Sequence, residues 1–126
     1  MTADPILDGS VDGQGRTTPT ATSLEGLLAA LELAPAADYP AELIGAIKET
    51  VVRGVGFLLR EQIQSGPYEG GMPGRIIGSG DATISAGADA PHIRIGYVQH
   101  ALCAFLGYEK LLPAESAAVL EEGRFR

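Results

Sequence analysis

The feature that most constrains the fold is a long run of apolar residues at helical spacing in the first half of the chain. Six of them form the pattern, with spacings of three or four positions that end in an adjacent pair: Ile44, Ile47, Val51, Val55, Leu58 and Leu59. Pro40 suits the first turn of a helix, and Gly66-Pro67 stops one, so the pattern predicts a helix that continues to Ile63. At 1.5 Å per residue, about 25 residues make a helix roughly 37 Å long.

Glycines interrupt this long pattern. They are Gly45, Gly54 and Gly56. Each costs about 1 kcal/mol relative to alanine inside a helix. We therefore expect them to mark close packing against a neighbouring helix.

Helical patterns also precede and follow the long one. The first helix is predicted over about Ser23 to Leu33, with Thr22 and Glu25 as a capping box and Pro35 as its end. A later helix starts near 93–95 and runs to 112. Its predicted apolar face is made of Ile95, Val98, Leu102, Phe105 and Leu106.

A short pattern over 114–122 predicts a fourth helix, after Pro113. The fold class is therefore all-α, with about four helices arranged as α/α hairpins. Residues 1–19 are rich in Gly, Asp and Thr and are expected to form an irregular N-terminal arm. Residues 20–126 then make the helical domain, which includes a long Gly-rich loop over 65–92, with a short hairpin around 75–77 and 83–85 as an option.

Composition limits the class of protein. A chain of 126 residues with 45% hydrophobic and 20% charged residues is typical of one soluble domain. The 16 acidic and 9 basic residues give a net charge of -7, which argues against nucleic acid and against anionic membranes as partners. The chain has no run of about 18 apolar residues and no signal peptide, and its lone Cys103 reads as a buried thiol in a helix, so a cytoplasmic location fits best.

The loop over 65–92 and the helix start after it contain the candidate ligand-binding residues. Loops on a rigid helical scaffold are common places for binding sites, and glycine lets the backbone approach a ligand. The candidates are Tyr68, Arg75, Arg94, Tyr97 and Gln99. The two arginines are suited to clamp a carboxylate or phosphate, and salt bridges to Glu69 or Asp89 explain them equally well.

Three residues are candidates for catalysis. Glu69 and Asp89 are the loop carboxylates that an acid–base pair for glycoside hydrolysis would need, and solvated loop charges are the alternative. His100 is suited to act as a general base near neutral pH, and a satisfied core histidine is the alternative.

Two short runs resemble a known superfamily. Phe57-Leu58-Leu59-Arg60-Glu61-Gln62 leading into Gly70-Gly71-Met72-Pro73, and Tyr97 to Leu102, resemble the helix, Gln and Gly-Gly signature of α/α-toroid proteins, of the terpenoid-cyclase-like and six-hairpin glycosidase-like kinds. A closed toroid uses about a dozen helices, so this chain resembles one sector of a ring. The resemblance implies a carbohydrate or isoprenoid pocket, but the aspartate-rich cyclase motif is absent and cyclase catalysis is not carried over.

No cofactor or metal is predicted. Asp8 to Gly15 matches the opening of a calcium loop, but Pro19 stands at the last position, where a bidentate glutamate is needed, so an Asp/Gly turn is favoured. His92 and His100 lack the other ligands of a zinc site. The Gly78-Ser79-Gly80-Asp81 run has no phosphate-binding lysine.

Two functions follow from these patterns. The first is a small helical ligand-binding or assembly domain, part of a larger or oligomeric α/α-toroid-like protein, with self-association as a symmetric dimer expected. The second is a carbohydrate-active enzyme, of the hydrolase or lyase type, that uses Glu69, Asp89 and His100 and takes its missing walls from another subunit.

Overall fold

The computed structural model describes residues 4–75 and 93–111 and has three helices there. They are α1 (Thr17–Ala37), α2 (Ala41–Glu61) and α3 (Ile95–Leu111). The described part of the chain contains no strand, which confirms the all-α class. The predicted fourth helix over 114–122 lies outside the described residues, and so does the hairpin, apart from Arg75.

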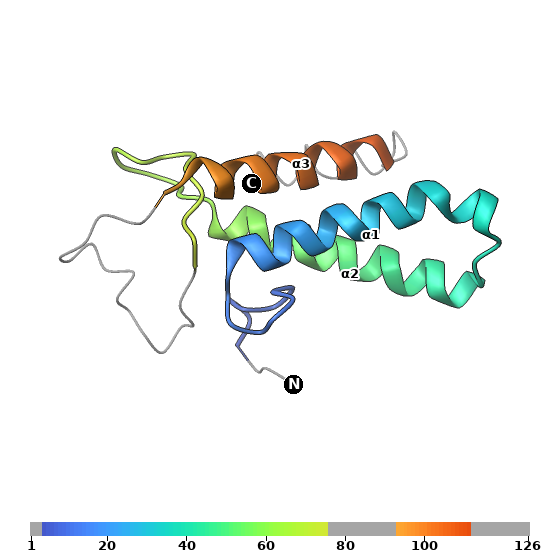
Figure 1. Cartoon of the computed structure of the whole chain (residues 1–126). Coiled ribbons are helices and arrows are strands. Elements are labelled where there is room, and N and C mark those ends of the chain that lie inside the picture. Colours follow the sequence, from blue (N-terminus) through green and yellow to red (C-terminus); the bar gives the residue numbers. More distant parts are fainter. Residues whose placement is uncertain (1–3, 76–92, 112–126) are drawn as a thin grey trace.

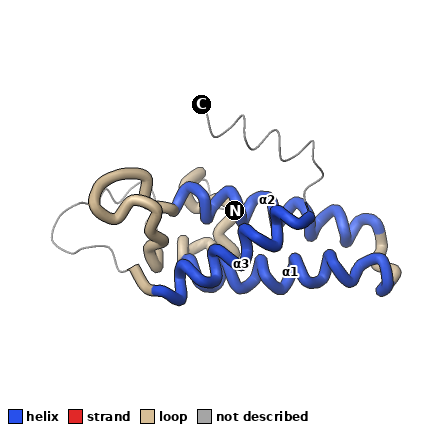
Figure 2. The backbone as a smooth tube through the Cα atoms, turned by 90° about the horizontal axis from the view of Figure 1, so that it is seen from above, coloured by secondary structure: helices blue, strands red, loops and turns tan. Residues whose placement is uncertain are grey.

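α1 and α2 lie side by side with their long axes roughly aligned, and α3 covers them (Figures 1 and 2). α1 and α2 form an antiparallel hairpin, and α3 packs on α1 and runs in the same direction (Figure 1). The view from above shows that α3 lies obliquely across the hairpin (Figure 2), and α3 contacts both α1 and α2. The start of α1, the end of α2 and the start of α3 therefore meet at one end of the bundle.

The first helix is longer than predicted at both ends. α1 begins at Thr17, so Thr22 is not an N-cap: its hydroxyl donates to the carbonyl of Thr18 one turn back, at 2.8 Å. Pro35 lies inside the helix, which continues to Ala37. A proline has no amide hydrogen, so Pro35 removes one hydrogen bond of the helix. In the last turn only two more residues follow it, and the helix continues through them to Ala37.

The turn between α1 and α2 follows the sequence prediction. Asp38 ends α1 in the left-handed region, at φ 53, which short polar side chains tolerate. Pro40 precedes the first residue of α2, and its carbonyl accepts the amide of Ile44 at 3.1 Å. α2 ends at Glu61, two residues before the predicted end.

The core lies between the helices and reaches the segment after α2. The largest fully buried side chains are those of Phe57, Leu24, Leu58, Val51, Thr17 and Thr20. Met72, 2% exposed, joins the same apolar cluster from the Gly-rich segment. The core therefore ties this segment to the helical hairpin.

Only one of the three glycines in α2 marks close helix packing. A Cβ atom at Gly54 would lie 2.6 Å from Cδ2 of Leu24 in α1. At Gly45 it would meet no heavy atom within 4 Å, and at Gly56 only the end of Arg60, at 3.3 Å. The expectation is confirmed at Gly54 and is wrong at the other two positions.

Most of the predicted apolar face of α3 points outward, but Phe105 is partly buried and packs against the core. Ala101 and Ala104 are the residues of α3 that are buried, at 1% and 0% exposure. Ile95, Leu102 and Leu106 are instead 87%, 52% and 52% exposed. Cys103, expected to be buried, is exposed. The sequence pattern of α3 does not determine which side is buried. One side has small alanines and another has large apolar residues, and either kind of side can face a core.

The N-terminal segment before α1 folds back against α2. Arg53 donates a hydrogen bond to the carboxylate of Asp8, and Arg60 donates one to the Asp8 carbonyl. Gly9, at φ +87, approaches α2 so closely that a Cβ atom would lie 2.0 Å from the Arg53 carbonyl oxygen. Only glycine combines this backbone conformation with this approach.

Candidate functional site

Three segments converge where α1 begins and α2 ends. The amide of Thr17 donates to the carbonyl of Gly74 at 3.0 Å. Isolated β-bridges pair Arg16 with Arg75 and Pro73 with Ile93. Segment 71–75 is thus fixed between the start of α1 on one side and Ile93, just before α3, on the other.

Glu61 is the buried acid of this junction. Its side chain is 4% exposed, and its Oε1 atom contacts the hydroxyl of Thr17. The same Thr17 hydroxyl contacts the carbonyl oxygen of Pro73. The second carboxyl oxygen of Glu61, Oε2, is buried and has no hydrogen-bond partner in the structure. The three residues form what we name the Glu61 cluster: Thr17, Glu61 and Pro73.

Burial raises the pKa of Glu61 from 4.5 to about 7, although the hydrogen bond with Thr17 acts in the opposite direction. Water stabilises a carboxylate anion far better than a protein interior does, so burial favours the neutral acid. The position adds to this effect, because Glu61 is the last residue of α2, where the partial negative charge of the helix disfavours an anion. The cluster can therefore hold a proton near neutral pH.

Sequence reasoning did not single out Glu61 as a functional residue. It was noticed only as part of the run that carries the toroid resemblance. The signal that could have found it is its position in the helical repeat. Gly54, Leu58 and Glu61 are spaced by four and then three positions, so Glu61 stands on the buried face of α2. A charged residue at such a position is rare unless it is partnered or neutral.

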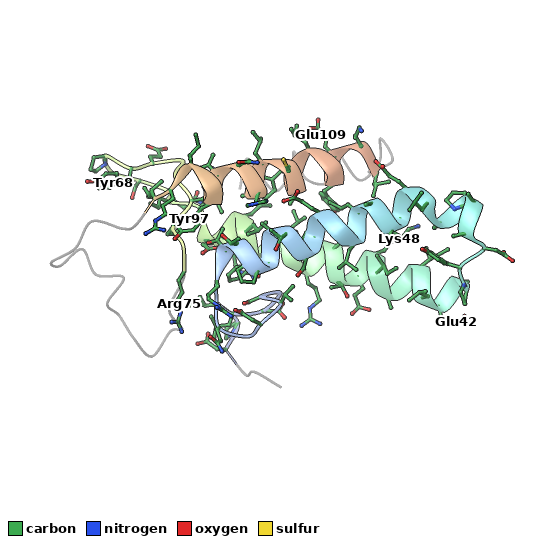
Figure 3. The ribbon with its side chains drawn as sticks, in the orientation of Figure 1. Glu42, Lys48, Tyr68, Arg75, Tyr97 and Glu109 are labelled. Carbon is green, nitrogen blue, oxygen red and sulfur yellow. The ribbon has the colours of Figure 1, made fainter. Side chains whose placement is uncertain are left out.

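The Gly-rich loop after α2 is closed at its base by backbone hydrogen bonds. The amide of Ile63 donates to Gly71 at 3.0 Å, and the amide of Gly70 donates back to Ile63 at 2.8 Å. Gly66 and Gly70 have φ values of +87 and +85, which the turn requires. Tyr68 and Glu69 lie exposed on this loop, and Figure 3 shows Tyr68 at the outer end of the molecule.

The predicted ligand-binding residues are divided between this loop and the start of α3. The Tyr97 ring packs on Gly74, where a Cβ atom would lie 2.7 Å from Cζ. Arg75 donates from Nε to the Gln14 carbonyl at 3.0 Å. Arg94 and Gln99 are exposed. Figure 3 shows Arg75 and Tyr97 at the same end of the molecule as Tyr68.

The two arginines make no salt bridge to Glu69 in the part of the chain that the structure describes. Asp89, the other predicted catalytic carboxylate, lies outside the described residues. The described contacts therefore do not join Glu69 to His100.

His100 is paired with a different acid. Its Nδ1 atom lies 2.7 Å from Oε1 of Glu25 in α1, and each side chain is 34% exposed. A carboxylate on Nδ1 fixes the tautomer and orients Nε2, an arrangement that supports a general base or a metal ligand. Glu25, expected to cap a helix, instead joins α1 to α3.

The calcium-like turn uses its carboxylates internally. Burial would raise the pKa of Asp12, but hydrogen bonds from the Gln14 amide, from Arg16 and from Ser10 outweigh it and lower the pKa to about 2. The Asp12 oxygens accept these bonds at 2.9, 2.5 and 2.9 Å. These contacts are those of an Asx turn. Within residues 4–75 and 93–111, no group of three or more His, Cys, Asp or Glu side chains is placed to hold a metal ion.

Of the described helices, none has both the length and the apolar character that crossing a bilayer requires. Comparison of the chain with protein-family models, with curated proteins and with solved structures gives no match. The candidate function therefore depends on the geometry of the chain itself.

Proposed function

We propose that the protein is a small helical assembly domain that forms a symmetric dimer through the outer face of α3. The outer α3 face is defined by Ile95, Val98, Leu102 and Leu106. The observation that carries the proposal is the exposure of these four apolar residues along one side of a helix that already has a buried side.

The outer α3 face is continuous. Its residues are separated by three, four and four positions, so they align along one side of the helix. They are exposed by 87%, 38%, 52% and 52% in chain order. Single exposed leucines are ordinary on protein surfaces, but an apolar row of this length favours an interaction surface.

Charge favours a second copy of this chain as the partner. The chain has a net charge of -7, so two copies repel each other over most of their surfaces. Between Ile95 and Tyr108, α3 contains no Asp, Glu, Lys or Arg. Two copies that meet along this stretch of α3 bring none of its carboxylates together.

Size and symmetry support the same arrangement. A domain of this length buries only about two-thirds of the surface of its unfolded chain, so further apolar burial adds stability. In a two-fold symmetric dimer the same surface patch of each subunit contacts its copy in the other. A row of apolar residues can pack against an identical row in this way. The proposal also includes a cytoplasmic location, which the exposed thiol of Cys103 supports because reducing compartments keep such thiols free.

The test is the solution mass, measured by size-exclusion chromatography with light scattering over a wide concentration range. The wild type is expected to be a dimer that dissociates on dilution. Leu102→Glu places a charge in the middle of the outer α3 face and is expected to give a monomer at every concentration. Its circular dichroism spectrum is expected to stay unchanged, because the side chain is half exposed.

Val52→Glu is the matched control. Val52 is 53% exposed, against 52% for Leu102, but it lies on α2. This variant is expected to remain a dimer. A wild type that is monomeric throughout, or a Val52→Glu variant that dissociates as Leu102→Glu does, would overturn the proposal. A monomeric wild type would leave the sector of a larger toroid-like protein as the hypothesis to pursue.

A further inference from the structure

We propose that the Glu61 cluster is a proton-operated latch, in which the neutral Glu61 side chain holds segment 71–75 against the start of α1 and its ionisation releases that segment. This inference does not depend on the proposed dimer, because the cluster and the outer α3 face share no residue.

The count of hydrogen atoms in the cluster carries the argument. The hydroxyl of Thr17 contacts two oxygens, Oε1 of Glu61 and the carbonyl of Pro73. A hydroxyl has one hydrogen, and a carbonyl oxygen is only an acceptor. If Glu61 is ionised, it is also only an acceptor, and one of the two contacts has no hydrogen. If Glu61 is protonated, its O–H donates to Thr17 and the Thr17 O–H donates to Pro73, so each contact is a hydrogen bond.

Burial gives the two protonation states different costs. Thr17 is 0% exposed and Glu61 is 4% exposed, so water does not solvate the cluster. The unpartnered Oε2 atom of Glu61 is a tolerable acceptor in a neutral acid but would carry half of an anionic charge. Opening the cluster to water is therefore the way in which an ionised Glu61 lowers its free energy.

Charged groups on the neighbouring segments are engaged elsewhere. On the α1 side, Arg16 binds Asp12 at 2.5 Å. On α2, Arg60 donates to the carbonyl of Asp8. On segment 71–75, Arg75 binds the Gln14 carbonyl. From α3, the Tyr97 ring covers Gly74.

None of these residues forms an ion pair with Glu61 in the described part of the chain. No cation is thus in place to stabilise the Glu61 anion, so the proton itself is what neutralises the site. The bound proton therefore stabilises the contact of segment 71–75 with α1, in addition to the backbone hydrogen bond from Thr17 to Gly74.

The direction of the pH effect follows from the two states. In the closed state the pKa of Glu61 is raised to about 7, and in an open, hydrated state it returns to 4.5. Opening therefore releases a proton between these two values and becomes more favourable as the pH rises through that range. Above the upper value both states are ionised and the effect levels off.

Hydrogen exchange at single amides, followed by NMR, tests the latch. The reporter is the amide of Thr17, which donates to Gly74 across the contact that opens. After correction for the intrinsic exchange rate, its protection is expected to fall about tenfold per pH unit between pH 4.5 and 7, and to change little above pH 7. The amide of Ile44, bonded to Pro40 at the other end of the hairpin, is the internal control and is expected to show no such fall.

Glu61→Gln is the decisive variant. Glutamine keeps the shape, cannot ionise and offers an N–H to the Thr17 hydroxyl, so protection of Thr17 is expected to stay constant with pH. Glu69→Gln removes an exposed carboxylate of the adjacent loop and is expected to keep the wild-type pH dependence. A wild-type Thr17 amide that follows Ile44, or a Glu61→Gln variant that retains the fall, would overturn the latch.

A second measurement keeps the test decisive if Glu61→Gln does not fold. The carboxyl carbon of Glu61 in the wild-type protein can be titrated by carbon-13 NMR. A midpoint near pH 7 supports the latch, and a midpoint near the ordinary 4.5 overturns it.

Discussion

Replacing Gly54 by alanine reverses the usual effect of a glycine-to-alanine change in a helix. Alanine normally stabilises an internal helical position by about 1 kcal/mol, since glycine loses more backbone entropy on folding. At Gly54 the added methyl group would lie 2.6 Å from Cδ2 and 3.1 Å from Cδ1 of Leu24. Ordinary contact starts at 3.4 Å, so Leu24 must withdraw by about 0.8 Å. Leu24 is 0% exposed, so it cannot withdraw into solvent.

The magnitude follows from two opposed terms. Overpacking of a core costs typically 1–3 kcal/mol. Set against the gain in helix propensity, Gly54→Ala is expected to lower the free energy of unfolding by about 1 kcal/mol. Gly45→Ala in the same helix has no heavy atom within 4 Å of the new methyl group and is expected to raise it by about 1 kcal/mol. The two variants should therefore differ by about 2 kcal/mol, with opposite signs.

Urea denaturation, followed by circular dichroism at constant pH, measures this difference. Equal stabilisation by both variants would refute the close approach of α1 and α2 at this position. A double-mutant cycle with Leu24→Val, which removes both Cδ atoms, adds a positive control: on that background the penalty at Gly54 should shrink. An unchanged penalty would show that its cause is not the contact with the Cδ atoms of Leu24.

Two further predictions concern charge and the N-terminal segment. Between pH 4.5 and 7 the stability of the wild type is expected to fall relative to Glu61→Gln by about 3 kcal/mol, at about 1.4 kcal/mol per pH unit, and the difference to level off above pH 7. Urea denaturation across this range checks it, and a constant difference would contradict it. Gly9→Ala is expected to destabilise more than Gly13→Ala: both have positive φ, but only Gly9 faces a backbone oxygen at 2.0 Å. Equal losses in thermal unfolding would contradict the docking of the segment on α2.

Local signals predicted α2 and its boundaries because the information lies within the helix and its ends. The apolar spacing, Pro40 and the acidic Glu42 of the first turn all favour the same structure, and the structure agrees within two residues. The start of α1 is different. At Thr17, the first residue of the helix, the amide is bonded to Gly74 and the hydroxyl contacts Glu61 and Pro73. These partners are 44 to 57 residues away in sequence.

The candidate site was predictable only in part, for the same reason. The sequence indicated that the Gly-rich loop and the start of α3 lie together, and Tyr97 on Gly74 agrees with this. It did not indicate that Glu25 pairs with His100, because residues 75 positions apart carry no local pattern. The sequence does not give the orientation of most of α3, because its fully buried residues are alanines, while Phe105 of the predicted apolar face packs against the core.

The docking of residues 4–16 on α2 also sets an order of events during synthesis. The Asp8 side chain and the Gly9 backbone need Arg53, which is added 45 residues after Asp8. The first turn of α1 needs Pro73 and Gly74, which are added later still. A segment whose contacts are this remote must wait for its partners to form before it gains any stabilisation. Residues 4–16 are therefore made before α2 and take up their final place after it.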